Sequence, residues 1–220
     1  MLHEKINDLK HRIMEMAAHV EKMLSLAFID AAGNDGEQFE EVCKLEKKVN
    51  AFEVEIDETC VMLIALYHPE ARDLRNILMM YRLNNDLERL GDQAVNIGES
   101  YVELIGNPIS LDLPELKNMR TITLSMLSQA VKAFASYDAE SARDVCKQDE
   151  IVDNFNRDII NKLILLIKED SMNIQSYLHL LRIAKNLERI ADLSTNVAEN
   201  TIYLVQGKVI KHYSDTIDTE

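Results

Sequence analysis

Acidic and amide side chains recur at a fixed spacing along two segments of the chain, and these residues are the best suited to chemistry. Each segment carries oxygen-bearing side chains at positions i, i+4, i+8 and i+11, a spacing that places them on one face of a helix. Oxygen ligands one helical turn apart can converge on one cation or bridge two cations. The predicted metal ligands are Glu88, Asp92, Asn96 and Glu99 in the first segment and Glu188, Asp192, Asn196 and Glu199 in the second.

Two upstream segments repeat the four-residue spacing. They add Glu46 with Asn50 and Asp149 with Asp153 to the predicted ligands. Like-charged side chains at i and i+4 destabilise a helix by roughly a few tenths of a kcal/mol, and a bound cation would reverse that repulsion. Ligand sets made only of oxygen suit iron, zinc, manganese or magnesium, and the pattern leaves the choice among them open.

Ordinary surface chemistry is the alternative to metal binding at these positions. A single Glu-x-x-x-Asp on a helix is usually a solvated face, and Arg89 and Arg189 could neutralise part of the charge as ordinary ion pairs. The occurrence of four such pairs at matching positions of the chain favours metal binding.

The sequence contains no recognisable catalytic motif. Ferritin-like di-iron proteins use Glu-x-x-His on two helices, and this pattern does not occur in the chain. A P-loop, a nucleophile elbow and a dinucleotide-binding fingerprint are also missing. No catalytic residue is therefore predicted, and a carboxylate-bridged metalloenzyme, for instance an oxidase or phosphatase, is the alternative function.

Long helices with short connections are expected to position these side chains. The chain has only three Pro and six Gly, and its commonest residues are good helix formers. Apolar residues recur with helical periodicity, and helix breakers divide the chain into six predicted helices. These helices span 2–32, the stretch from the turn at 33–36 to residue 67, 70–105, 114–137, 139–167, and a last stretch that ends near 207.

The two halves of the sequence are copies of one three-helix unit. Residues 82–99 align with 182–199 with seven identical positions, and residues 43–52 align with 146–155. The predicted fold is therefore all-α, with two tandem three-helix bundles related by internal duplication. The predicted repeats are 1–107 and 113–207, followed by a flexible tail at 208–220. Polar positions match better than apolar ones, which indicates a polar function performed twice.

Charge and hydropathy restrict the partners and the compartment. The formal net charge is −14 and the isoelectric point is about 4.9. Such a surface repels nucleic acid and anionic lipid head groups, so we expect no nucleic-acid binding and no direct membrane insertion. The apolar runs are too short to span a bilayer, and the first residues do not form a signal peptide, so the protein is expected to be cytoplasmic. The three cysteines lack metal-binding spacing and are expected to be free thiols.

The motifs of both repeats together resemble those of the PhoU family. The first repeat carries His68-Pro-Glu-Ala-Arg-Asp-Leu-Arg75, Leu87-Glu-Arg-Leu-Gly-Asp92 and Asn96-Ile-Gly-Glu99. The second carries Asn186-Leu-Glu-Arg-Ile-Ala-Asp192 and Asn196-Val-Ala-Glu199. The resemblance covers essentially the whole chain and implies two three-helix bundles side by side in a homodimer.

The resemblance also implies a function. Members of the family are negative regulators of phosphate uptake that link the phosphate ABC transporter ATPase to the sensor histidine kinase of the phosphate regulon. Such a protein would be cytoplasmic and would reach the inner membrane only through its partners. Some members carry iron or zinc clusters on motifs that Glu88, Asp92, Glu188, Asp192, Asp149 and Asp153 match here. Glu46 matches as well, but Asn50 replaces the second acid, which weakens the first site.

Two other functions fit the sequence. The chain could be a plain helical scaffold whose acidic faces bind only water, or a PhoU-like regulator of another transporter. Neither a Gly-rich loop nor a convergent basic group is evident, so any response to phosphate is expected to be indirect.

Overall fold

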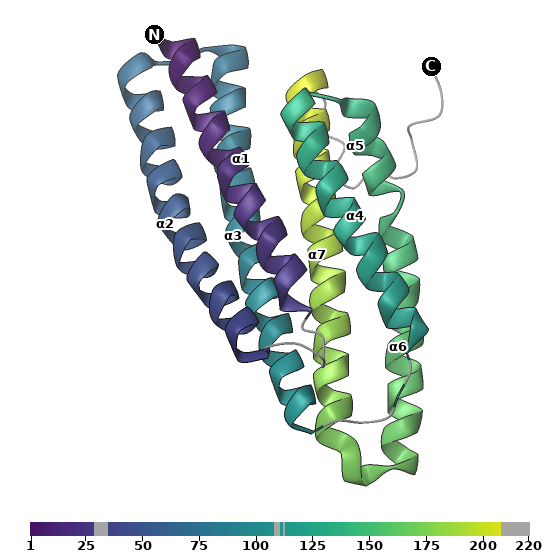
Figure 1. Ribbon diagram of the computed structural model, residues 1–220. Helices are drawn as coiled ribbons and strands as arrows, with labels where there is room; N and C mark the ends of the chain where they lie inside the picture. The colour runs from purple at the N-terminus through teal and green to yellow at the C-terminus, as the bar shows by residue number, and fades with distance from the viewer. Residues whose placement is uncertain (29–34, 108–110, 112, 208–220) are drawn as a thin grey trace, which may run out of the picture.

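The computed structural model describes residues 1–28, 35–107, 111 and 113–207. Within those residues the chain is helical and contains no strand (Figure 1). The elements are α1 (Leu2–Ala27), α2 (Asp35–Tyr67), α3 (Ala71–Gly106), α4 (Pro114–Ser136), α5 (Ala139–Cys146), α6 (Asp149–Glu169), the short 3₁₀ helix η1 (Ser171–Asn173) and α7 (Ile174–Gln206). The predicted all-α fold with two repeats is confirmed, and the predicted tail at 208–220 lies outside the described residues.

The two repeats form two helical bundles that share a central helix pair. Helices α1, α2 and α3 pack together, as do α4, α5, α6 and α7, and α3 lies alongside α7. These two long helices run antiparallel, as Figure 1 shows. Helix α1 also contacts α4. The third helix of each repeat therefore joins the bundles, and both carry the carboxylate motifs.

The predicted fifth helix is wrong in one respect, because it is divided at Lys147 and Gln148 into α5 and α6. In a continuous helix the amide of Gln148 would bond to the carbonyl of Asp144. Instead the side-chain Nε2 of Gln148 donates to that carbonyl at 3.1 Å, and the backbone amide donates to Val145 at 3.0 Å. The side chain thus replaces one backbone bond and opens a turn just before Asp149.

Helix ends follow local chemistry elsewhere. Pro114 occupies the first position of α4, as predicted, where its missing N–H costs nothing. Tyr137, in the left-handed region, ends α4, and the carboxylate of Asp138 accepts bonds from two amides at the start of α5. Helix α1 ends at Ala27 rather than at the predicted residue 32, and residues 29–34 lie outside the described part.

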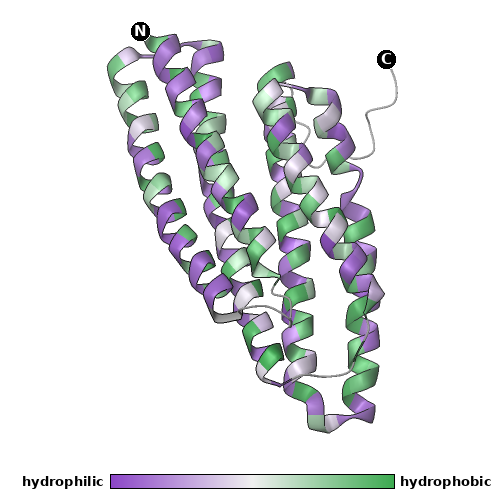
Figure 2. Ribbon diagram, in the orientation of Figure 1, coloured by the Kyte–Doolittle hydropathy of each residue, from purple (hydrophilic) through white to green (hydrophobic). Residues whose placement is uncertain are grey.

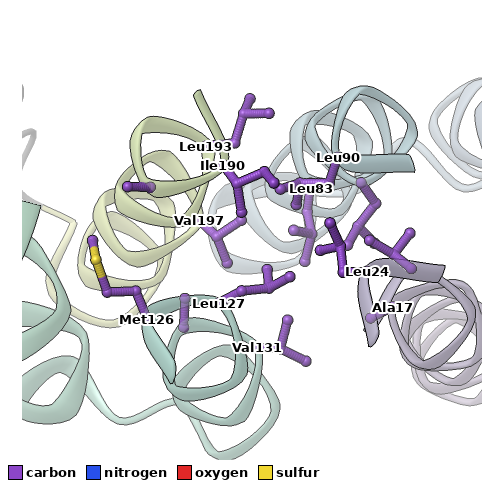
Figure 3. Close-up of a cluster of buried hydrophobic side chains, with 14 of the residues drawn as sticks. Ala17, Leu24, Leu83, Leu90, Met126, Leu127, Val131, Ile190, Leu193 and Val197 are labelled. Carbon is purple, nitrogen blue, oxygen red and sulfur yellow. The ribbon is translucent and has the colours of Figure 1, made fainter. Parts of the chain in front are cut away.

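An apolar core fills the space between the bundles. Apolar residues face inward and polar residues outward along most helices (Figure 2). The close-up in Figure 3 shows side chains of α1, α3, α4 and α7 meeting between the repeats. Burying this surface is the main driving force for joining the two bundles. The shared core includes Leu24, Leu83, Leu90, Leu127, Ile190 and Val197, all at most 2% exposed.

The two copies have the same exposure pattern but different packing partners. Along 82–98 and 182–198, buried, half-buried and exposed positions coincide residue by residue. A Cβ on Gly98 would lie only 2.8 Å from the ring of Phe39. In the second repeat, Ala198 stands in the position of Gly98 and Ala142 in the position of Phe39. The larger residue on α7 is therefore accompanied by a smaller residue opposite it.

We expect Gly98→Ala to lower the free energy of unfolding by about 1–3 kcal/mol, because the added methyl overpacks against Phe39. Gly91→Ala is the matched control, because its Cβ would make an ordinary 3.4 Å contact with Val49. Gly91→Ala should raise stability by about 0.5–1 kcal/mol through helix propensity. Urea unfolding measures both, and a Gly98→Ala cost that persists in a Phe39→Ala background would contradict this explanation.

Candidate metal centre

Four carboxylates from α2 and α3 gather in the first repeat. This first carboxylate set consists of Glu46, Glu53, Glu88 and Asp92. The pKa of Glu88 is raised by burial and then by the negative charges of Asp92, Glu53 and Glu46, while Arg89 partly opposes the shift. The part of the shift that comes from these charges means that the ionised carboxylates repel one another and that a positive charge among them would be stabilised.

Glu53 was not among the ligands predicted from the sequence. It lies seven residues, about two helical turns, after Glu46, and therefore on the same face of α2. Asn84 of α3 donates to the Glu53 carbonyl at 2.8 Å and to Asp57 at 2.8 Å, which fixes α2 against α3 at this level. The predicted ligand Asn50 is exposed, and Glu53 acts more strongly on Glu88 than Glu46 does. The seven-residue spacing was the signal that could have identified Glu53.

The second repeat gathers Asp149 and Asp153 of α6 with Glu188 and Asp192 of α7, as predicted. We call these residues the second carboxylate set. The pKa of Asp192 is raised to about 6, first by desolvation and then by Glu188, Asp149 and Asp153. The pKa of Asp149 is also raised, by burial and then by Asp153, although Thr195 donates to it at 3.4 Å. Asp192 is therefore affected by all three other carboxylates, and Asp149 by Asp153 and Glu188.

The carboxylates of the two sets do not converge on a single point in each set. Both oxygens of Glu188 accept from Lys185 Nζ at 2.6 Å, so this carboxylate is engaged by its own helix. Within residues 1–28, 35–107, 111 and 113–207, no group of three or more His, Cys, Asp or Glu side chains is placed so that it could hold a metal ion. Metal binding would therefore require side-chain rotation within each set.

Asn96 and Glu99 bind across the repeat boundary instead of joining the first carboxylate set. Arg182 of α7 donates to Asn96 Oδ1 at 2.5 Å and to Glu99 Oε2 at 2.8 Å. Of their counterparts, Asn196 lines a polar pocket and Glu199 lies near Cys146, whose thiol pKa is raised to about 11 by burial and by Glu199 and Asp149. Asn96 and Glu99 thus hold the repeats together. Asn196 lines their junction, whereas Glu199 lies within the second repeat.

The polar pocket lies between α3, α6 and α7 and has a volume of about 710 Å³. Arg89 and Arg189 both line it, and neither guanidinium forms an ion pair with another described residue. Arg89 nevertheless neutralises part of the charge on Glu88, the role considered for it as an alternative to metal binding, without a direct ion pair. Lys185 lines the same pocket, so three basic side chains converge here, which the sequence did not reveal.

The donor chemistry of the two carboxylate sets fits a hard or borderline cation. Each set offers four carboxylates from two neighbouring helices, three half-buried and one exposed. Asn156 holds the position equivalent to Glu53, is 8% exposed, and has an Oδ1 without a hydrogen-bond partner among the described residues. Oxygen donors of this kind suit iron, zinc, manganese or magnesium, with no thiolate or imidazole needed.

We expect Asp192→Asn to stabilise the metal-free protein at pH 7.5. The folded-state pKa of about 6 exceeds the unfolded value of about 3.9, so stability is lost as the pH rises between these values. The gain in melting temperature should therefore shrink towards pH 4. Asp158→Asn, an exposed acid elsewhere on α6, is the control; an Asp192→Asn protein that melts at or below the wild-type temperature at pH 7.5 would refute the repulsion.

Known proteins resemble this chain over nearly its whole length. The PhoU domain matches twice, at residues 13–101 and 116–201. The phosphate-specific transport system accessory protein PhoU homolog of Aquifex aeolicus is 35% identical over 211 residues, which cover 96% of both chains.

Two crystal structures give the same result. PhoU from Pseudomonas aeruginosa superposes with a TM-score of 0.90 at 31% identity, covering 94% of this chain and all of the other. The phosphate transport system regulatory protein PhoU from Streptococcus pneumoniae gives 0.86 at 28% identity, covering 95% and 99%. The two matched domains, the duplicated helical fold and these relatives show that the chain belongs to the PhoU family.

Proposed function

We propose that this protein is a non-enzymatic accessory regulator of phosphate-specific transport whose two carboxylate sets bind metal ions. The observation that carries the proposal is the duplication of a four-carboxylate set, two of whose members lie on the long helix that joins each repeat to the other. Relatives of nearly the same length are named as accessory or regulatory proteins of phosphate transport. That naming supports a regulator rather than an enzyme.

Iron and zinc clusters are the metals proposed, with manganese and magnesium as alternatives. Glu46, Glu53, Glu88 and Asp92 would hold the metal in the first repeat, and Asp149, Asp153, Glu188 and Asp192 in the second. A bound cation supplies positive charge that relieves the repulsion within each set and ties α2 to α3 and α6 to α7. Lys185 would leave Glu188 when metal binds, because the carboxylate cannot serve both fully.

The proposed regulatory role is that of an adaptor. It would dock on the ATPase of the phosphate ABC transporter and on the sensor histidine kinase, as a homodimer, and lower phosphate uptake and phosphate-regulon signalling. No helix among the described residues is long and apolar enough to cross a membrane. We therefore propose a cytoplasmic protein that meets the inner membrane through these partners.

Metal loading tests the first part of the proposal. Protein purified without an affinity tag and reconstituted with iron, zinc or manganese should hold metal in both repeats. Glu53→Gln/Glu88→Gln/Asp92→Asn and Asp149→Asn/Glu188→Gln/Asp192→Asn should each lose about half of it, because each removes most ligands of one site. Elemental analysis measures the content.

Matched variants make this test specific. Glu58→Gln/Asp158→Asn removes exposed acids outside both sets and should keep full loading. Glu53→Gln alone should lower first-repeat occupancy more than Asn50→Ala does. A wild-type chain that takes up none of the three metals would disprove the metal-binding part and leave a plain scaffold or a metal-free adaptor.

Partner capture tests the second part. The purified protein should retain the transporter ATPase and the sensor kinase of its own organism in a pull-down. Either triple variant should weaken retention at least about tenfold, a loss of roughly 1.4 kcal/mol, because the metal fixes the helices that present the docking surface. Capture of neither partner would reject the adaptor, and metal-dependent turnover lost in Asp92→Asn would favour a metalloenzyme.

A further inference from the structure

The polar pocket between the repeats is lined by two arginines that form no ion pair with another described residue, although the charge of Arg89 still lowers the pKa of Glu88. Arg89 and Arg189 stand at equivalent positions of the two copies, and both line the pocket. Other basic groups find partners in this acidic chain, as Arg182 does with Glu99 and Lys162 with Glu115. Two unpaired guanidiniums facing one pocket form a set of donors suited to an oxyanion.

The pocket also contains a buried acceptor. Gln93 lines the same pocket and is 9% exposed. Its Nε2 donates to the carbonyl of Arg89 at 3.2 Å, while its Oε1 has no hydrogen-bond partner among the described residues. A buried polar oxygen without a partner is costly, so this atom points to a ligand that brings its own proton donor.

The pocket is also lined by three acidic residues, Asp149, Glu188 and Asp192. Lys185 donates to Glu188, and its charge also acts on Asp192. The two arginines therefore share the pocket with Asp149 and Asp192, which form no ion pair among the described residues. An anion alone would gain little from a pocket of zero net charge, whereas an anion that arrives with a divalent cation supplies partners for both the arginines and the carboxylates.

We propose that this pocket binds inorganic phosphate together with a divalent cation, the phosphate on Arg89 and Arg189 and the cation on Asp149 and Asp192. The inference rests on the metal binding proposed above and deepens it. At neutral pH phosphate carries a hydroxyl that can donate to Gln93 Oε1, whereas sulfate has no proton to donate. A site with a buried acceptor rejects the analogue that lacks the donor.

Free phosphate fits the pocket better than a nucleotide. Leu193 is the only apolar side chain in the pocket lining, and it is 3% exposed. The lining contains no aromatic ring on which a base could stack. The ligand is therefore a small, fully polar oxyanion.

Calorimetric titration of inorganic phosphate into the full chain, with and without Mn²⁺, tests the proposal. Binding should require Mn²⁺, fall at least tenfold in Arg89→Gln/Arg189→Gln, and stay unchanged in Arg82→Gln, an exposed arginine of α3 outside the pocket. Gln93→Leu should reduce the preference for phosphate over sulfate at least fivefold. Circular dichroism checks that each variant is folded.

Different negative results would contradict the phosphate inference and the proposed metal binding. Protein that binds Mn²⁺ but not phosphate, or an arginine variant that binds phosphate as well as wild type, overturns this inference and leaves the proposed metal binding intact. Protein that binds no Mn²⁺ overturns both. ATP that competes more strongly than free phosphate overturns the assignment of the ligand.

Discussion

The packing of α3 against α7 is the constraint on which the other features of the molecule depend. Each helix buries one stripe in the core shared by the repeats, with Leu83 and Leu90 on α3 and Ile190 on α7. The same helices carry the carboxylate motifs. Because the two helices run antiparallel (Figure 1), one repeated motif supplies both walls of the junction. The polar pocket is therefore a consequence of how the core packs.

The carboxylate sets oppose the stability that this core provides. The pKa values of Glu88, Asp149 and Asp192 are raised first by burial and then by neighbouring carboxylates, so each folded repeat disfavours the ionised forms of these groups. Polar contacts offset part of this cost. Asn84 fixes α2 to α3, and Arg182 bonds to Asn96 and Glu99 across the junction. Natural proteins keep such destabilising groups together where they serve a function, which agrees with sites built for cations.

The sequence predicted the helices and the duplication because both depend on local periodicity and on breakers such as Pro114. It did not predict the break at Gln148, because the amide that replaces a backbone bond is a contact of one side chain. It also treated Asn96 as a metal ligand, since the position of Arg182 depends on the antiparallel packing of α7. The convergence of Arg89 and Arg189 has the same origin, because they come from different repeats. Of the features that the sequence analysis missed, only the place of Glu53 could have been predicted, from its spacing to Glu46.

The differences between the copies show what both retain. Asn50 and Glu53 of the first repeat correspond to Asp153 and Asn156 of the second, so an acid and an amide exchange positions. Each repeat thereby keeps four carboxylates in different geometry, and a repeat kept only for packing would have no need of that number. Asn85 stands where the second repeat has Lys185. The second set therefore has a lysine that donates to Glu188, whereas in the first set Arg89 acts on Glu88 only through its charge. This difference makes the two sites unequal.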